Sequence, residues 1–153
     1  MPGKLHPMTT HATANAEMKS WDEHTWDGKR YDEVTGPKQT VGGMTATYTG
    51  DLEAVGDLRF VMSYPDDASC VSTGYEVVTG ALGGRTGSFV LRHDGGFHDG
   101  VADATVTVAS ATGGLTGLTG TGRITWAQGE PGRLELDYDL PEHHAIARSG
   151  DEG

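Results

Sequence analysis

Short segments of alternating hydrophobic and polar residues recur along the chain, and most of them end at glycine, proline or aspartate. This period of two predicts β-strands separated by tight turns. The series begins at residues 10–21, where Ala12, Ala14 and Ala16 alternate with polar residues and Trp21 falls on the face opposite the alanines. The pattern continues in residues 38–49, 57–64, 69–81, 85–93, 101–109, 119–128 and 133–140.

These eight segments indicate an all-β fold with little or no helix, because no window has apolar residues at helical spacing over three turns. The strands would form a closed barrel or a sandwich. The barrel is favoured because closure leaves no open strand edge, and because glycines inside strands supply the bends that closure requires. Residues 22–37 have no sustained period and are predicted to be a long loop, which often serves a site.

Length and cysteine content bound the architecture. The 153 residues and 24 dispersed glycines fit one domain with many turns. We expect a disordered leader over residues 1–9, the barrel over 10–140 and a flexible tail over 141–153. Cys70 is the only cysteine, so no internal disulfide can form and the cytoplasm is the expected location. No segment approaches the roughly 20 apolar residues of a membrane helix.

The charge balance narrows the range of partners. The chain has 22 acidic and 11 basic side chains, which gives a formal net charge of −11. Such a protein repels phosphate backbones and anionic lipids unless a basic patch offsets the charge, and the sequence contains no such patch. We therefore expect neither nucleic acid nor a membrane as a partner.

Several motifs resemble those of a known bacterial family. They are GALGGRTGSFVLRHDGGFHDG from Gly80, GGLTGLTGTG from Gly113, SWDE from Ser20, TYTGDLEAVGD from Thr47 and LELDYDL near the end. With these motifs, residues 10–140 resemble domain-of-unknown-function family 3224, which is assigned to the allene-oxide-cyclase-like barrels. The resemblance implies a single eight-stranded, mostly antiparallel closed barrel with a central cavity. It carries no established activity, so function must be argued from the residues.

Glu76 is the candidate catalytic residue. Alternation places it on one face with Cys70, Ser72, Gly74 and Gly80, where small neighbours leave room for a cavity. A carboxyl group in a partly dry cavity holds its proton tightly and can act as a general acid or base near neutral pH. We expect Glu76→Gln to abolish activity, keep the fold and be at least as stable at pH 7. The alternative is an exposed acid, or one paired with an arginine across the barrel.

The candidate ligand-binding residues combine aromatic rings with a cation and an imidazole. Aromatic residues in a cavity would stack on an apolar ligand, or else they only fill the core. A cation inside would bind a carboxylate or stabilise an enolate, whereas outside it would pair with Asp or Glu at little benefit. Arg59, Arg85, Arg92 and Arg123 are open to the same two interpretations. The ligand-binding set is Trp21, Lys38, Tyr64, Tyr75, His93 and Trp126.

The RHDGGFHDG segment invites a metal interpretation that its spacing disfavours. His93 and His98 flank Gly95–Gly96, which is typical of a hairpin turn, and their separation matches no recurring ligand motif. We predict a turn with exposed histidines and no metal. The glycine-rich segments contain neither a dinucleotide-binding nor a Walker motif, and no cofactor is expected.

These observations favour a barrel that binds an apolar or polyfunctional organic molecule and acts on it as a cofactor-independent cyclase or isomerase. In such an enzyme the cavity restrains the substrate while one acid or base assists. The alternative is a non-catalytic binding or scaffold barrel that forms a homo-oligomer. Exposed apolar residues at Val61 or Val90 would favour this alternative.

Overall fold

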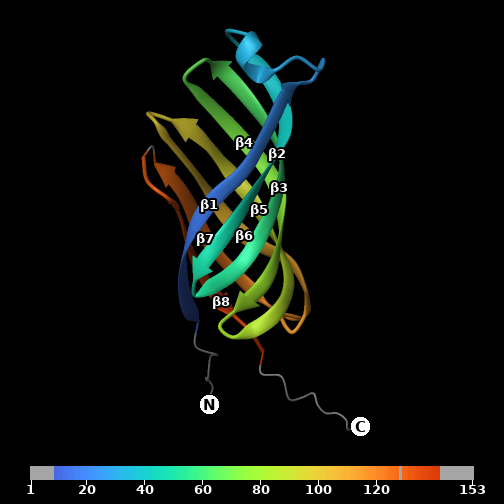
Figure 1. Cartoon of the computed structure of the whole chain (residues 1–153), viewed down its shortest axis with the longest axis vertical. Helices are drawn as coiled ribbons and strands as arrows, with labels where there is room; N and C mark the ends of the chain where they lie inside the picture. Colours follow the sequence, from blue (N-terminus) through green and yellow to red (C-terminus); the bar gives the residue numbers. More distant parts are fainter. Residues whose placement is uncertain (1–8, 128, 142–153) are drawn as a thin grey trace, which may run out of the picture.

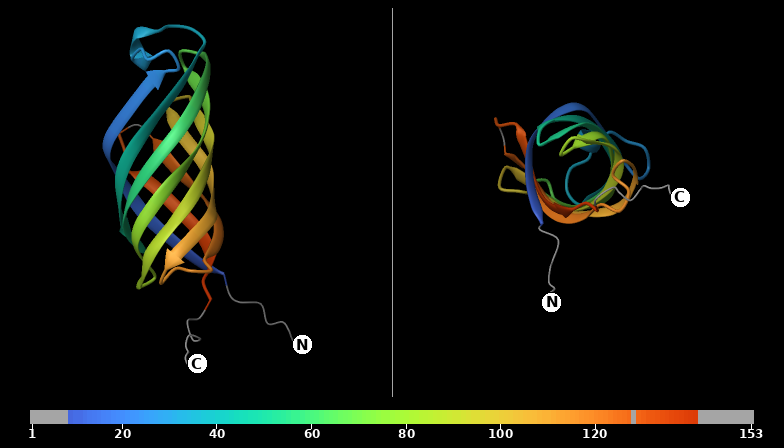
Figure 2. Two further views of the ribbon diagram at one scale, coloured as in Figure 1. Left: turned by 90° about the vertical axis from the view of Figure 1, so that its right-hand side faces the viewer. Right: turned by 90° about the horizontal axis from the view of Figure 1, so that it is seen from below.

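The structure is a computed structural model that describes residues 9–127 and 129–141. Eight antiparallel strands, each paired with its neighbours in sequence, close into a barrel where β1 meets β8 (Figures 1 and 2). The strands are β1 (Thr10–Thr25), β2 (Lys38–Gly50), β3 (Leu52–Asp66), β4 (Ser69–Leu82), β5 (Arg85–His98), β6 (Val101–Gly113), β7 (Thr119–Ala127) and β8 (Gly132–Asp139). The predicted all-β barrel is confirmed.

Helical structure within the described residues is limited to η1 (Tyr31–Glu33), a single 3-10 turn in the connection between β1 and β2. None of it is long and apolar enough to cross a membrane. The predicted leader and tail fall almost wholly on residues 1–8 and 142–153, which lie outside the described residues.

Four strands, β1, β3, β5 and β6, are at least four residues longer than the sequence pattern predicts. β1 continues through Thr25, so residues 22–25 are strand and the connection to β2 is shorter than expected. β3 begins at Leu52 and β5 runs on to His98. The weak alternation at these strand ends is overridden by pairing with neighbouring strands, as is common for β-structure.

The predicted turn at Gly95–Gly96 is wrong, because both glycines lie inside β5 and the turn falls at residues 99–100. A Cβ atom at Gly95 would overlap the carbonyl oxygen of Asp103, and one at Gly96 would overlap that of Cys70. These glycines therefore permit close approach of the strands on either side. As a result His93 is buried inside the barrel, and only His98 is exposed.

A bulge in β1 changes which residues face inward. Met18 pairs with Ala46 but Ser20 pairs with Thr45, so Lys19 is an extra residue. A bulge of this kind shifts the alternation by one position. Before it the alanines face the core, and after it Trp21 and Glu23 turn inward, contrary to the face predicted for Trp21.

The half of the barrel where β1 begins and β8 ends is filled with side chains. Small residues at Ala12, Ala14 and Ala16 leave space for the large residues Tyr48 and Phe89, which are almost completely buried. Burying one large apolar side chain contributes about 1.5–3 kcal/mol. This packed half supports the rest of the barrel.

The other half of the barrel is open on one side. β1 pairs with β8 only over Thr10–Ala16 and Gly132–Tyr138, and beyond Ala16 it pairs with β2 alone. In Figure 1 the upper part of β1 diverges from β7 and β8. The barrel wall is therefore complete in the half where β1 pairs with β8. In the other half it has a gap between β1 and the connection from β7 to β8.

Candidate functional site

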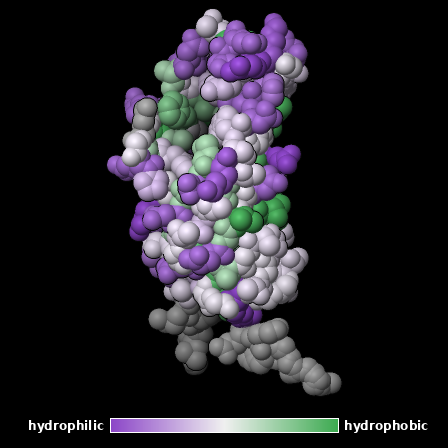
Figure 3. Space-filling view, in the orientation of Figure 1, coloured by the Kyte–Doolittle hydropathy of each residue, from purple (hydrophilic) through white to green (hydrophobic). Residues whose placement is uncertain are grey.

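The open half contains a pocket of about 420 Å³, here called the barrel pocket. Its volume falls within the roughly 300–1,000 Å³ typical of small-molecule sites. The space-filling view shows a recess in the upper part of this face, with apolar surface beside it (Figure 3). The residues around the pocket are mainly apolar, and the larger ones include Met44, Met62, Phe97, Ile124 and Trp126.

Small residues explain why the barrel is hollow here. Ser72, Gly96, Ala102 and Ala104 line the pocket, whereas the same strands carry larger residues such as Leu82, Phe89 and Val106 in the packed half. An eight-stranded barrel is just wide enough for side chains to fill it, so shortening several of them leaves a cavity. The pocket therefore forms between the strands of the barrel itself, without an added loop or helix.

Glu76 lies deep inside the barrel with 0% of its surface exposed. The hydroxyl of Tyr48 donates to Oε2 at 2.7 Å, and Nε2 of His93 lies 2.8 Å from Oε1. A Cβ atom at Gly56 would overlap the carboxyl group, so this glycine on β3 makes room for it. Glu76 is thus neither exposed nor paired with an arginine, and its partners come from β2 and β5.

His93 stands between Glu76 and the barrel pocket. It is 6% exposed and lines the pocket, whereas Glu76 does not. Glu76 accepts a hydrogen bond, so the ring hydrogen is assigned to Nε2. Nδ1 forms no hydrogen bond with any described residue. It also keeps some exposed surface, because it is not a fully buried atom that lacks a partner. The lone pair of Nδ1 is therefore available to a bound molecule.

Burial affects Tyr48 strongly. Its pKa is raised well above the ordinary 10.0, first by burial and then by the charge and hydrogen bond of Glu76. The Tyr48 hydroxyl therefore keeps its proton and donates to Glu76 over the physiological range of pH. Together, Tyr48 and Glu76 fix the position of the His93 ring.

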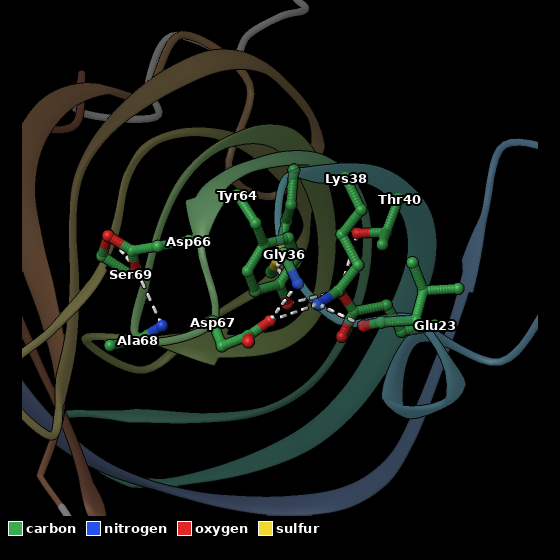
Figure 4. A network of polar contacts seen from close by, with 11 residues as sticks. Glu23, Gly36, Lys38, Thr40, Tyr64, Asp66, Asp67, Ala68 and Ser69 are labelled. Carbon is green, nitrogen blue, oxygen red and sulfur yellow. Dashed lines mark hydrogen bonds and ion pairs between the residues drawn. The ribbon is translucent and has the colours of Figure 1, made fainter.

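A second buried carboxylate, that of Glu23, lines the barrel pocket. Oε2 accepts hydrogen bonds from the hydroxyls of Tyr64 at 2.5 Å and Thr40 at 2.6 Å, and the Trp21 indole donates to Oε1 at 3.2 Å. Figure 4 shows Glu23, Thr40 and Tyr64 together. Burial, followed by the hydrogen bond and charge of Glu23, raises the pKa of Tyr64.

Lys38 lies beside this group without lining the pocket. Its buried Nζ donates to the carbonyl of Val34 at 3.0 Å and lies 3.7 Å from Oδ1 of Asp67 (Figure 4). It also lies 4.5 Å from the centre of the Tyr64 ring. Lys38 therefore ties the β1–β2 connection to the β3–β4 turn, and its charge is already partnered.

The structure brings four of the predicted ligand-binding residues to the barrel pocket, namely Trp21, Tyr64, His93 and Trp126. Tyr75 does not line the barrel pocket, because it alternates with Glu76 and is 56% exposed on the outer wall. The exposed arginines fit the interpretation in which cations on the outer wall pair with Asp or Glu. Arg59 pairs with Asp57, Arg92 with Asp94 and Arg123 with Asp103.

Glu23 is the functional candidate that the sequence pattern did not predict. Regular alternation from the alanines would place it on the outer face, and only the bulge at Lys19 turns it inward. The described residues contain no group of three or more His, Cys, Asp or Glu side chains placed to hold a metal ion.

Cys70 lines the barrel pocket and provides a probe of it. Burial raises the pKa of its thiol above the ordinary 9.0. Because the thiolate is the reactive form, we expect iodoacetamide to modify native Cys70 at pH 8 at least tenfold more slowly than the unfolded chain. Mass spectrometry with and without urea measures the two rates, and equal rates would contradict the buried position.

Residues 12–138 match the family described as "Protein of unknown function (DUF3224)". Among solved structures, the chain is similar to a protein with unknown function from the DUF3224 family of Shewanella oneidensis MR-1. The two are 26% identical with a TM-score of 0.70, and the match covers 88% of this chain and 99% of the other. A search of curated proteins finds no significant match.

Proposed function

Because the chain belongs to the DUF3224 family, whose description assigns no activity, we propose its function from the barrel pocket itself. The protein binds a small, largely apolar organic molecule, and His93 acts on it as a general base and acid. The observation that carries this proposal is the buried Glu76–His93 pair, with His93 at the wall of a mainly apolar pocket.

The chemistry that fits is a proton transfer without a cofactor. Nδ1 of His93 would remove a proton from a carbon or hydroxyl of the bound molecule, and Glu76 would stabilise the resulting imidazolium ion. Return of the proton to another atom completes an isomerisation or ring closure, with no net gain or loss of atoms or electrons. Glu76 was predicted to be the catalytic residue. Because it does not reach the pocket, we assign it the role of positioning His93 instead.

Two further expectations belong to this proposal. The resemblance to allene-oxide-cyclase-like barrels would favour cyclisation of a flexible molecule held in the pocket, where restraint of the substrate lowers the barrier. A cytoplasmic location suits the single cysteine.

Binding is tested with the uncharged dye Nile red and a pair of matched variants. Ala104 lines the pocket, whereas Ala109 is exposed on the same strand. We expect Ala104→Leu to weaken dye binding at least tenfold by filling the pocket, and Ala109→Leu to change it less than about twofold. Fluorescence titration measures both, and equal binding by the two variants would contradict binding in the barrel pocket.

Proton transfer is tested with 5-nitrobenzisoxazole, whose ring opens when a base removes its carbon-bound proton. We expect His93→Gln to lower the rate about 100-fold, as for loss of a general base, while the exposed His98→Gln leaves it unchanged. Glu76→Gln should lower the rate and shift its pH profile. A rate that is the same in wild type and His93→Gln would refute the role of His93.

A second candidate function is a scaffold that assembles through the outer wall. Val61 is 43% exposed and lies opposite the exposed Val41 on β2, with Val71 and Tyr75 exposed on β4. Val90 is only partly exposed. Analytical ultracentrifugation distinguishes the two functions, because an oligomer that Val61→Glu dissociates would favour the scaffold.

A further inference from the structure

We propose that the barrel pocket selects molecules carrying an amine or another cationic hydrogen-bond donor, and that it rejects carboxylates. This inference rests on the proposed function, since it names the class of molecule that the same pocket takes. It assigns to Glu23 the role of recognising the ligand, separate from the proton transfer proposed for His93.

The charges around the pocket are one-sided. Its described lining includes the acids Glu23 and Asp103 and contains no lysine or arginine. Arg123 pairs with Asp103 at 3.0 Å on the outside, so Glu23 is the acid without a cationic partner among the described residues. The nearby ammonium of Lys38 is occupied by Val34 and Asp67.

The hydrogen bonds of Glu23 leave one of its oxygens able to accept a further donor. Every group that contacts it is a donor, namely the hydroxyls of Tyr64 and Thr40 and the indole of Trp21. An ionised carboxylate accepts only, so this set suits the charged form. Oε1 receives a single, rather long bond of 3.2 Å and can accept another from a ligand, whereas Oε2 already accepts two.

The remaining wall also favours a cation. Trp21 and Trp126 line the pocket and offer π-faces, and Met44 and Met62 offer polarisable sulfur atoms. A desolvated ammonium group is attracted to such rings, with tryptophan the best partner. A carboxylate would lose its hydration and face Glu23, with no lysine or arginine in the described lining to offset the cost. The net charge of −11 acts in the same direction at longer range.

Three compounds with one apolar cage separate charge from shape. They are 1-adamantylamine, 1-adamantanol and adamantane-1-carboxylic acid, which at pH 7 are cationic, neutral and anionic. By isothermal titration calorimetry we expect the amine to bind about tenfold more tightly than the alcohol, and the alcohol about tenfold more tightly than the acid. An acid that binds as tightly as the amine would overturn the inference and leave the proposed function standing.

A matched pair of variants assigns the selectivity to Glu23. Glu23→Gln should reduce the preference for the amine over the alcohol to less than about threefold, with the affinity for the alcohol nearly unchanged. Glu17→Gln makes the same change in net charge at an exposed position on the same strand and should keep the tenfold preference. If both variants keep the preference, Glu23 is not the cause. If wild type binds none of the three compounds or Nile red, the proposed function fails too.

Discussion

Replacing Glu76 with alanine is expected to lower the free energy of unfolding by about 2–6 kcal/mol, because two buried donors lose their acceptor at about 1–3 kcal/mol each. The hydroxyl of Tyr48 and Nε2 of His93 would both lose their acceptor in the interior. That cost is a large part of the total stability of a domain of this size, about 5–15 kcal/mol. Urea denaturation followed by tryptophan fluorescence measures it.

The control is Glu17→Ala, which removes a glutamate that is exposed on a strand. We expect a change within about 0.5 kcal/mol there. Glu76→Gln should be intermediate, costing about 1–3 kcal/mol, because an amide offers one acceptor where two donors face the side chain. The hydrogen bonds thus reverse the sequence-based expectation that this variant is as stable as wild type. A Glu76→Ala variant within 1 kcal/mol of wild type would show that the contacts do not stabilise the barrel.

Stability should fall steeply above about pH 10, because the pKa of Tyr48 is raised in the folded state. Below that pH the phenol is neutral in the folded and unfolded chains and contributes no pH dependence. Above it the unfolded chain releases the proton while the folded protein retains it. Each further pH unit then lowers the free energy of unfolding by about 1.4 kcal/mol. Tyr64 adds to this in the same direction, reduced by its partial contact with solvent.

Urea denaturation at a series of alkaline pH values, together with tyrosinate absorbance, tests this result. The absorbance of ionised Tyr48 should appear only as the protein unfolds. Tyr48→Phe should be less stable than wild type at pH 8, because Glu76 loses a donor, yet its stability should decline less steeply above pH 10. The same slope in both proteins would mean that Tyr48 ionises freely in the folded barrel.

Glu76 shows what regular alternation can predict. β4 has no bulge between Ser69 and Leu82, so the period of two holds from Cys70 to Gly80 and correctly places Glu76 inside. Its partners could not be predicted in the same way. The contact with Tyr48 and His93 depends on the relative register of β2, β3, β4 and β5, which no local pattern encodes.

Trp21, Glu23 and His93 show where local patterns fail. The bulge at Lys19 reverses the face of the β1 residues that follow it, and nothing in the neighbouring sequence marks it. Gly95–Gly96 is typical of a turn, but here two neighbouring strands need the space that side chains would occupy. In both cases a tertiary contact outweighs a local preference, so the inward orientation of these three residues follows only from the fold.

The pairing of the first strand with the last has a consequence for biosynthesis. β1 leaves the ribosome long before residues 132–139, its partners at closure, have been translated. During that interval a growing sheet of up to seven strands has two unprotected edges, which can pair with another nascent chain. Completion of β8 removes both edges at once, so interruption of translation within the last strand should leave a product prone to aggregate.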